Sequence, residues 1–584
     1  MATSTIQQQV ALPSPMVRSV PSGGLFIMAA LLIGFGFWVI YPIILIFVNS
    51  FNTAGLGQTP VWSLENWRTA WSHPGAFPSI WNTLLVYALY TSIGFPTAVA
   101  VAWALARTKM PFGRGLEFMF WVSFMLPNIS TTVGWAFLLD PDRGMLNRAL
   151  VDVFSFINVS PFNIYSVPGI VFAHLMSNEI SQGVMLLTPA FRNMDMALEE
   201  AARVSGASNL RTMLRVTLPL MTPPIVVVFM LKMARMLQSF EIEQILGTPI
   251  NFYIYSTRIY QFIQFEPPQY GTAAALASVT LLLVGIIIPL QRWLLGRRQF
   301  TTVSGQFKPG VIDLRWMQPI AFILIVILVT MLTVVPIVTL VGGSFMTRVG
   351  FFQITPLFTT QHWELVLGDR GFMRALITTL SLASATAIVS PLVFSMVAYV
   401  MVRTHWPGRG WLDSIFWLSA AIPGILASFG LLSMFLQTPF LRAIYGTVYA
   451  LALVVILQGK LTSTQLVKGV FMQLGSDLEE AARVSGAGWI YTYVRIWLPL
   501  ILPTLVTIGT FNFVIAANTT SSIILLATRD TLTLSLLALE MMTNEQGRQL
   551  EQAGIISLIL TLMTVGLALV ARGFGFRVGI RQHL

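Results

Sequence analysis

Apolar stretches long enough to cross a lipid bilayer recur along the whole 584-residue chain. A membrane-spanning helix needs roughly 20 mostly apolar residues. About twelve stretches of that length lie near residues 25–49, 80–105, 116–139, 164–188, 217–238, 272–291, 319–345, 376–402, 412–436, 444–466, 497–527 and 554–571. Only 10% of the residues are charged, against about 25% in a typical soluble domain. We therefore expect a multi-pass membrane protein, and a water-soluble enzyme is disfavoured.

The positive charges between these stretches predict the orientation of the chain. With a cytoplasmic N-terminus, cytoplasmic segments hold roughly twice as many Lys and Arg residues as outer segments, as the positive-inside rule requires. Both termini are therefore expected in the cytoplasm, and the protein is expected in the bacterial cytoplasmic (inner) membrane. The basic residues are spread over short loops, which argues against a nucleic-acid partner. The chain has no Cys, which excludes thiolate metal sites.

The chain contains an internal duplication. Residues 199–207 and 479–487 have the same sequence, Glu-Glu-Ala-Ala-Arg-Val-Ser-Gly-Ala, at an offset of 280 residues. Arg107 and Pro127 match Arg403 and Pro423 at an offset of 296 residues. The difference places about 16 additional residues in the first half, and we expect them in the outer loop around 140–163. Six spans per half put the two repeats in the same orientation, and parallel repeats commonly enclose a transport path.

The expected fold class is an all-α membrane protein with about twelve transmembrane helices in two parallel six-helix repeats. The expected parts are a cytoplasmic tail at 1–24, a first transmembrane half at 25–291, a cytoplasmic linker at 292–318, a second transmembrane half at 319–572 and a cytoplasmic tail at 573–584.

The repeated segment is the most specific motif of the sequence. Acidic residues before two alanines favour the first turn of a short helix with a flat face, and a following glycine ends it. The first copy combines Glu200-Ala201-Ala202 and Gly206 with Val216-Thr217-Leu218-Pro219. The second combines Glu480-Ala481-Ala482 and Gly486 with Ile496-Trp497-Leu498-Pro499. Both follow the pattern E-A-A-x3-G-x9-I-x-L-P, from which only Val216 departs, and both resemble the EAA loop of ABC importer permeases.

This resemblance implies the type I ABC importer permease fold and a coupling helix in each half that docks in a cleft of an ATPase subunit. The residues to which it assigns ATPase coupling are Glu199, Glu200, Ala201, Ala202, Arg203, Gly206, Glu479, Glu480, Ala481, Ala482, Arg483 and Gly486. The alternative is an ordinary amphipathic helix at the membrane surface.

The resemblance also implies partner proteins. The expected partners are two copies of an ABC ATPase subunit, which bind ATP and Mg, and a periplasmic or lipid-anchored solute-binding protein. The sequence has no nucleotide-binding loop of its own, because Gly459-Lys460 lacks the earlier glycine and the following Ser or Thr. We expect a transport subunit and not an enzyme, with no cofactor, no catalytic residues and no metal site on this chain.

Two further segments concern the solute. Residues 161–169 and 246–260 resemble fused two-half permeases of the ferric iron importer group. That resemblance favours ferric iron or a ferric–anion complex. A phosphonate or other organophosphate, thiamine or a polyamine are the alternatives.

Ionisable residues inside the spans are costly and are candidate functional residues. Lys232 and Arg235 are three residues apart and so share a helix face. With Asn178 and Glu179 of the preceding span, and Asn512 and Asn518 of the second half, they are candidates for a translocation path. The alternative is a Lys/Arg–Glu network that locks adjacent helices. A different class of protein, an ion-gradient-driven secondary carrier, would use Glu179 or the Lys232/Arg235 face as its coupling site, but would have no use for two EAA loops.

Overall fold

A computed structural model describes residues 22–55, 58–154, 160–296, 311–404, 406, 408–420, 422–475, 477–543 and 549–573. In these ranges the chain is helical, apart from loops and three isolated β-bridges. Most of the expected linker at 292–318 and most of both expected tails lie outside the described residues.

The helices of the first half are α1 (Ser22–Asn49), α2 (Glu65–Ser72), α3 (Ala76–Arg107), α4 (Gly113–Met125), α5 (Asn128–Leu139), α6 (Met145–Val153), α7 (Val167–His174), α8 (Ile180–Arg192), α9 (Ala197–Val204), α10 (Asn209–Thr212), α11 (Leu218–Arg235), α12 (Glu241–Leu246), α13 (Tyr255–Gln264) and α14 (Tyr270–Gly296). The π-helical turns η1 (Leu175–Glu179) and η2 (Met213–Thr217) and the 3₁₀ turns η3 (Met236–Gln238) and η4 (Thr248–Ile250) complete it.

The helices of the second half are α15 (Met317–Val329), α16 (Val335–Phe345), α17 (Gln361–Gly368), α18 (Arg370–Arg403), α19 (Arg409–Ala420), α20 (Gly424–Gln437), α21 (Pro439–Arg442), α22 (Val448–Gln458), α23 (Lys460–Gln473), α24 (Asp477–Val484), α25 (Trp489–Thr492), α26 (Leu498–Asn518), α27 (Leu534–Thr543) and α28 (Leu550–Gly573). The π-helical turns η5 (Thr330–Val334) and η6 (Tyr493–Trp497) lie between them.

The described residues contain 7 helices long and apolar enough to cross a membrane, or up to 10 if each bent pair is one span. The stretches expected at 164–188 and 272–291 are also helical, in α7–η1–α8 and α14, but are not among those ten. The structure therefore has helices at all twelve expected stretches, and ten of these meet the length and hydropathy expected of a span, three of them as bent pairs.

The third span of each half is broken, which corrects the expectation of continuous helices at 116–139 and 412–436. The axes of α4 and α5 differ by 97° and those of α19 and α20 by 111°. Pro127 and Pro423 stand at the two breaks, in extended conformation, directly before α5 and α20. Proline has no backbone N–H and disfavours helical geometry in the residue before it, so a helix ends there.

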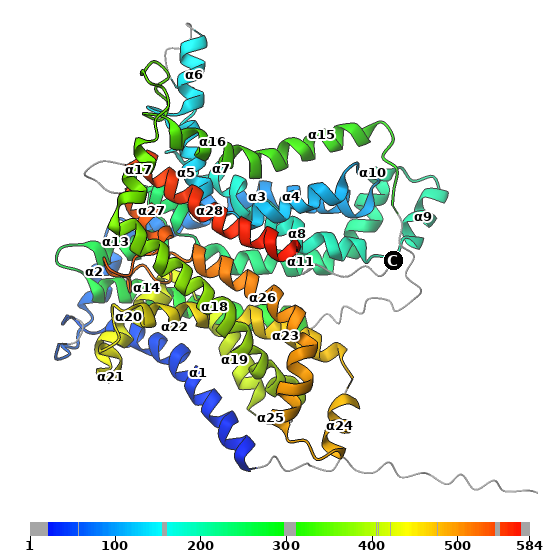
Figure 1. Ribbon diagram of the computed structural model, residues 1–584, viewed down its shortest axis with the longest axis vertical. Helices are drawn as coiled ribbons and strands as arrows, with labels where there is room; N and C mark the ends of the chain where they lie inside the picture. Colours follow the sequence, from blue (N-terminus) through cyan, green and yellow to red (C-terminus); the bar gives the residue numbers. More distant parts are fainter. Residues whose placement is uncertain are drawn as a thin grey trace, which may run out of the picture.

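The first helices of each half pack against the other half. The helix α1 contacts α19 and α20 of the second half, whereas α15 contacts α4 and α16 contacts α5 of the first half. Figure 1 shows this exchange, with α1 beside the second-half helices and α15 beside α4. The largest apolar core draws buried residues from both halves, including Phe137, Phe262, Phe372 and Phe429. Because this core is shared, the two halves form one helical body whose repeats are interleaved.

Candidate functional site

The repeated nine-residue segments form two similar short helices, α9 and α24, which we call the EAA helices. Both end at a glycine in the left-handed region, Gly206 at φ +85° and Gly486 at φ +80°. In each, the next backbone N–H reaches back over the last turn, from Ala207 to the Ala202 carbonyl at 3.0 Å and from Ala487 to the Ala482 carbonyl at 2.9 Å. This is the Schellman end that only glycine forms without strain.

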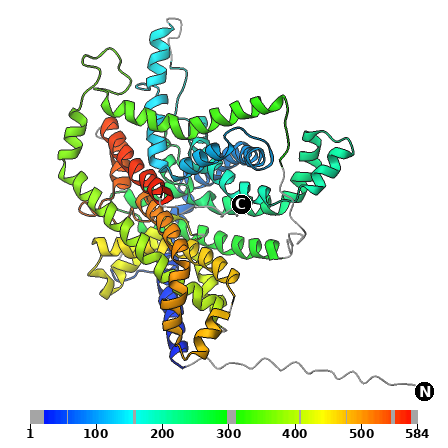
Figure 2. The ribbon, with the colours of Figure 1, turned by 45° about the vertical axis from the view of Figure 1, so that its right-hand side comes forward.

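The EAA helices expose apolar side chains at matching positions. Val204 and Val484 are both 90% exposed, and Leu198 and Leu478 are 53% and 47% exposed. Ala201 and Ala481 are exposed between them. Figures 1 and 2 show the two helices well apart on the periphery of the molecule, each projecting from its own half. Each half therefore offers a small apolar patch on a short helix with nothing packed over it in the described chain.

Glu199 ties the first EAA helix to the spans. Its carboxylate is fully buried and forms an ion pair with Arg107, the last residue of α3. It also accepts a hydrogen bond of 2.6 Å from the Thr217 hydroxyl, directly before α11. Arg107 donates in addition to the Met194 carbonyl at 3.0 Å. A buried ion pair needs further hydrogen bonds to offset the loss of water. The Met194 carbonyl and the Thr217 hydroxyl supply two of them, while Arg107 Nε has no hydrogen-bond partner among the described residues. Together these contacts fix α9 to α3 and α11.

The second EAA helix is anchored by other contacts. Glu479 is buried and accepts a 3.2 Å hydrogen bond from the Tyr399 hydroxyl of α18. Arg403, the counterpart of Arg107, donates to the carbonyls of Phe471 and Leu474 at 2.8 and 2.7 Å. Its guanidinium lies 4.8 Å from the ring centre of Trp497, which replaces Thr217. The same helix is thus held by a different set of side chains.

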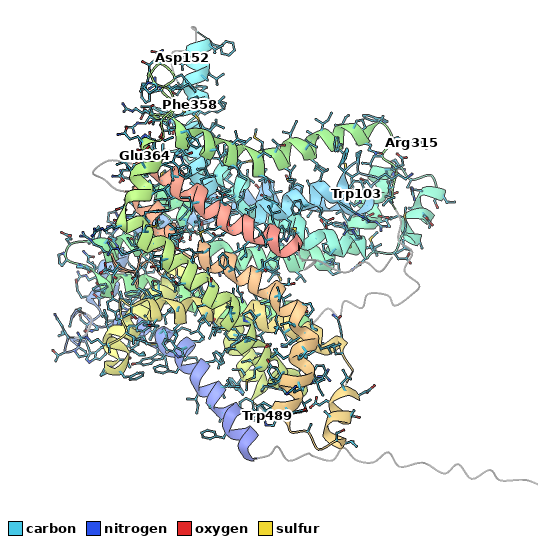
Figure 3. All side chains as sticks on the ribbon, in the orientation of Figure 1. Trp103, Asp152, Arg315, Phe358, Glu364 and Trp489 are labelled. Carbon is cyan, nitrogen blue, oxygen red and sulfur yellow. The ribbon has the colours of Figure 1, made fainter. Side chains whose placement is uncertain are left out.

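The end of the segment that links the two halves is hydrogen-bonded to residues near the first EAA helix. Residues 311–314 lie along the chain that follows α3, with the Ile312 N–H donating to the Arg107 carbonyl at 2.7 Å and the Lys109 N–H to the Ile312 carbonyl at 3.1 Å. Asn209 of α10 donates to the Asp313 carbonyl at 3.0 Å. In Figure 3, Arg315 and Trp103 lie at this end of the molecule and Trp489 near the other EAA helix. The segment that enters α15 is therefore hydrogen-bonded to the base of the first EAA loop.

A buried polar pair joins two spans of the first half. The Lys232 ammonium lies 2.7 Å from Glu179 Oε1, and both side chains are largely enclosed. A glycine makes room for this pair, because a Cβ on Gly94 would lie 2.9 Å from the Glu179 side chain. A Cβ on Gly183 would lie 2.5 Å from the Ala98 Cβ, so Gly183 allows α8 to pack closely on α3 beside the pair. The pair links η1 to α11.

The second half has an uncharged network at the corresponding place. Asn512, the counterpart of Lys232, donates to the hydroxyls of Ser390 and Ser463 at 3.0 Å each. Here the glycine is Gly459, where a Cβ would lie 2.4 Å from the Ser390 hydroxyl. In the duplication Gly94 corresponds to Ser390, and Glu179 corresponds to Gly459. The position that is glycine in one half therefore carries the polar side chain in the other.

Comparison with protein families decides what this architecture is. Residues 94–300 and 391–578 each match the model of the binding-protein-dependent transport system inner membrane component. Two matches cover most of the chain and coincide with the two repeats. The chain belongs to this family. It is a permease subunit of the ABC importer type, in which ATP hydrolysis occurs on a separate subunit.

Individual relatives carry names for different solutes. The permease is 26% identical, over 88% of its length and 80% of the relative, to FbpB 1 of Haemophilus influenzae, named as a putative ferric transport system permease protein. It is 26% identical, over 74% of its length and 76% of the relative, to y4fN of Sinorhizobium fredii, named as a probable ABC transporter permease protein. A chain of a solved bacterial ABC transporter for alginate import aligns with 47% of the permease and 96% of its own length at 18% identity, with a TM-score of 0.40.

The remaining candidate residues of the permease lie apart from one another. Glu200 and Arg203 are half-buried on α9, and Glu480 is exposed on α24. The side-chain amide of Asn178 donates to the side-chain oxygen (Oδ1) of Asn128 at 2.9 Å, and Asn518 ends α26. The side chains of Arg235 and Arg483 lie outside the described residues.

Sequence reasoning missed several residues that hold the EAA helices. In the sequence, Arg107 and Arg403 stood out only as matching positions of the duplication, and Thr217 and Trp497 only as positions within the EAA motif. Tyr399 gave no signal. A charged residue that ends an apolar span in both repeats was the available hint, since such a residue needs a buried partner or water.

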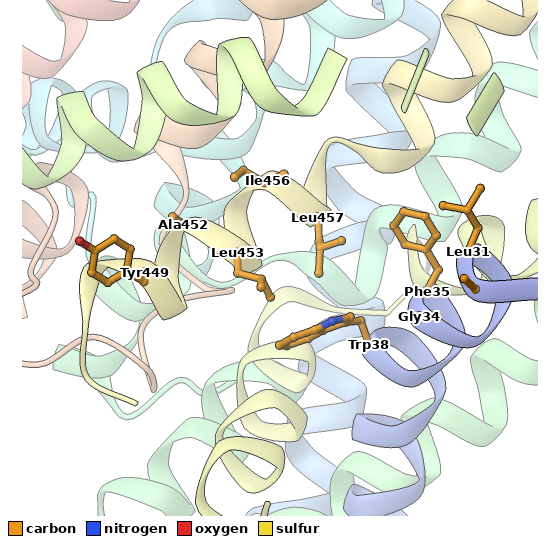
Figure 4. A pocket seen from close by; sticks show the side chains of 10 residues that line it. Leu31, Gly34, Phe35, Trp38, Tyr449, Ala452, Leu453, Ile456 and Leu457 are labelled. Carbon is orange, nitrogen blue, oxygen red and sulfur yellow. The ribbon is translucent and has the colours of Figure 1, made fainter. Parts of the chain in front are cut away.

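Two other features concern clusters of polar side chains and cavities. Among the described residues, no group of three or more His, Asp or Glu side chains is placed to hold a metal ion. An apolar pocket lies between α1 and α22, lined by residues such as Phe35, Trp38 and Leu453 (Figure 4). It has no charged lining residue and lies away from the EAA helices and the Lys232–Glu179 pair.

Proposed function

We propose that this permease moves ferric iron, as the ion or as a ferric–anion complex, inward by alternating access between its two halves. The name of the relative that covers 88% of the chain supports this solute, as does the resemblance of residues 161–169 and 246–260 to ferric iron permeases. The permease is an inner-membrane protein with both termini in the cytoplasm. The iron is cargo, delivered by a periplasmic or lipid-anchored binding protein.

Two copies of an ABC ATPase, which bind ATP and Mg, drive the cycle by docking on the EAA helices. The observation that carries this proposal is that α9 and α24 expose similar surfaces although different side chains hold them to the spans. Their Leu198/Leu478 and Val204/Val484 pairs are similarly exposed, and both end at a left-handed glycine. Two identical ATPase subunits require two equal docking surfaces, one on each half.

The Lys232–Glu179 pair serves as a lock between helices and not as a site for an anionic solute. Lys232 is 3% exposed, and its ammonium is engaged by the Glu179 side chain and backbone carbonyl. A solute that passed here would first have to displace a buried carboxylate. Asn512, 1% exposed, has the same role in the second half.

The docking proposal is tested with the double variant Glu200→Ala/Glu480→Ala. The matched control is Ser205→Ala/Ser485→Ala, at the exposed last turns of the same helices. We expect the glutamate variant to lose co-purification of the ATPase and ATP-driven uptake, while the serine variant keeps both. Normal uptake by the glutamate variant at equal expression would refute docking through these residues.

The solute is tested by reconstituting the permease, its ATPase and its binding protein in liposomes. We expect ATP-dependent entry of labelled ferric citrate. Entry of a phosphonate, thiamine or a polyamine in its place would reassign the solute and leave the docking proposal intact. Transport by the permease alone under an imposed ion gradient would make it a secondary carrier and overturn both.

A further inference from the structure

The first half carries an outer-loop helix that the second half lacks. The helix α6, Met145–Val153, lies in the loop where the two offsets of the duplication predict about 16 additional residues, whereas the second half has only the single turn α21. Neither the EAA helices nor the Lys232–Glu179 pair involves α6. A segment kept on one side of a duplicated protein calls for a role of its own.

The direction of α6 is set by fixed contacts at its base. The side-chain amide of Asn147, fully buried, donates to the carbonyls of Asp140 and Phe162 at 2.9 and 2.8 Å and accepts from the Phe162 N–H at 3.1 Å. Arg148 donates to the Asp142 carbonyl at 2.6 and 2.8 Å. These bonds close the two ends of the loop, so α6 projects as a braced element.

A second loop supports α6 from the other half. The Arg148 guanidinium lies 5.2 Å from the ring centre of Phe351, which Arg348 approaches to 4.4 Å from the same loop. Gly350, at φ +79°, brings its backbone so close to the Arg143 carbonyl that a Cβ would lie 1.8 Å from that oxygen. The contact joins the two halves at the base of α6.

Apolar and charged side chains of α6 lie on two different faces. Leu146, Ala149, Leu150 and Val153 recur at helical spacing, whereas Arg148 and Asp152 stand on the other face. Leu146 packs against the shared core, and Val153 at the end of the helix is the exposed member of the apolar face. Val153 is 72% exposed and the following Phe154 43%. The neighbouring loop adds Phe358, which is 61% exposed. This apolar surface is therefore open at the tip of the projection.

The projection points sideways from the spans. In Figures 1 and 2 the helices α15 and α16 run across the molecule, and α6 stands upright on their far end, away from α9. Figure 3 labels Asp152 and Phe358 together at this tip. The helix α6 follows α5 in the chain and packs on it. Because α15 and α16 form a 29-residue apolar span that crosses the bilayer, a helix that projects sideways beside the end of this span runs along the membrane surface and does not extend away from it.

We infer that α6 is a membrane-interface helix, which seats Val153 and Phe154 at the boundary between lipid headgroups and acyl chains. An amphipathic helix in the plane of the interface buries its apolar face there and leaves its charges among the headgroups. Phe358 enters the same layer from the second half. The permease thus holds one side of its outer rim on the lipid surface.

The natural absence of Cys makes a depth measurement direct. A spin label is placed on Val153→Cys in permease reconstituted in lipid nanodiscs, and its collision rates with oxygen and with a water-soluble nickel complex are compared. Ile327→Cys, on the exposed surface of α15, reports the lipid value, and Val204→Cys on α9 reports the water value. Asp152→Cys is the matched control on the polar face of α6.

We expect the oxygen-to-nickel ratio at Val153 to shift toward that at Ile327, with Asp152 closer to Val204. Equal ratios at Val153 and Val204 would overturn the inference. Protection of Val153 from nickel only after a solute-binding protein is added would also overturn it, because the tip of α6 would then be a protein-docking surface. Because Val153 is exposed and outside the core, its replacement leaves folding unaffected, and circular dichroism with size-exclusion chromatography checks this for each variant.

Discussion

The two EAA helices have the same sequence and the same glycine-terminated end, yet the contacts beneath them differ. The first rests on a buried Arg107–Glu199 ion pair closed by Thr217. Under the second, Tyr399 donates to Glu479 while Arg403 lies over Trp497. The exposed surfaces of the two EAA helices have to be alike if they bind identical ATPase subunits, whereas the buried contacts that hold each helix only need hydrogen-bond partners. The identical residues at 199–207 and 479–487 are therefore expected to form the docking surface, and the residues that differ between the halves hold each helix in place.

The same lesson holds inside the spans. Gly94 leaves room for Glu179 in the first half, and Gly459 leaves room for Ser390 in the second. One half closes this contact with a charged pair and the other with neutral hydrogen bonds. Since a buried charge needs its partner far more than a buried amide does, the first half should be the more sensitive to single substitutions.

The largest expected effect is at Glu199. Glu199→Ala leaves Arg107, 1% exposed, without its carboxylate, and loss of one partner of a buried ion pair costs about 3–5 kcal/mol. Glu479→Ala should cost clearly less, because Arg403 keeps two carbonyls and the Trp497 ring. Thermal unfolding of the purified variants measures the difference. The double variant Arg107→Met/Glu199→Leu should regain part of the loss, and equal destabilisation by the two alanine variants would contradict the comparison.

The intramembrane pair comes next. Lys232→Met should destabilise the permease by about 3 kcal/mol, because Glu179 then stays enclosed without its cation. Transplanting part of the second-half network with Gly94→Ser, Glu179→Gly and Lys232→Asn should restore part of that stability. Gly183 is left unchanged, because a Cβ there would lie 2.5 Å from the Ala98 Cβ. Unfolding and uptake are measured together on both variants. If the transplanted network folds well but does not transport, the pair belongs to the solute path and the lock is rejected.

A smaller loss of stability is expected at Thr217, which the second half replaces by Trp497. Thr217→Val keeps the shape of the side chain but removes a hydrogen bond to a charged group, at a cost of about 1.5–3 kcal/mol. The control is Thr222→Val, four residues into α11, whose hydroxyl bonds only to the Leu218 carbonyl and is exposed. Chemical denaturation of both variants tests this. Equal stability of the two would mean that Thr217 contributes nothing beyond packing.

Much of the fold was predictable because lipid imposes strict rules. Long apolar stretches and the duplicated motif predicted the helices and the two halves, whereas the orientation predicted from the loop charges stays a prediction. The near-right-angle breaks before Pro127 and Pro423 were not predicted, because membrane helices also tolerate proline within a continuous span. The anchors were not predicted either. Arg107 and Glu199 are 92 residues apart, and only packing brings such positions together.

The smallest expected effect should be the same in both halves. Gly206 and Gly486 hold positive φ, and a Cβ added at either would meet nothing within 4 Å, so Gly→Ala at either position meets backbone strain alone, about 1 kcal/mol. Gly488→Ala is the matched control, since Gly488 has an ordinary φ of −70° and equally open space. Fraying of the last turn should weaken ATPase binding about fivefold for each of the two variants, as titration of the purified permease with its ATPase would measure. Unequal losses at Gly206 and Gly486 would show that the two docking surfaces are not equivalent, and would extend the asymmetry of the anchors to the surface itself.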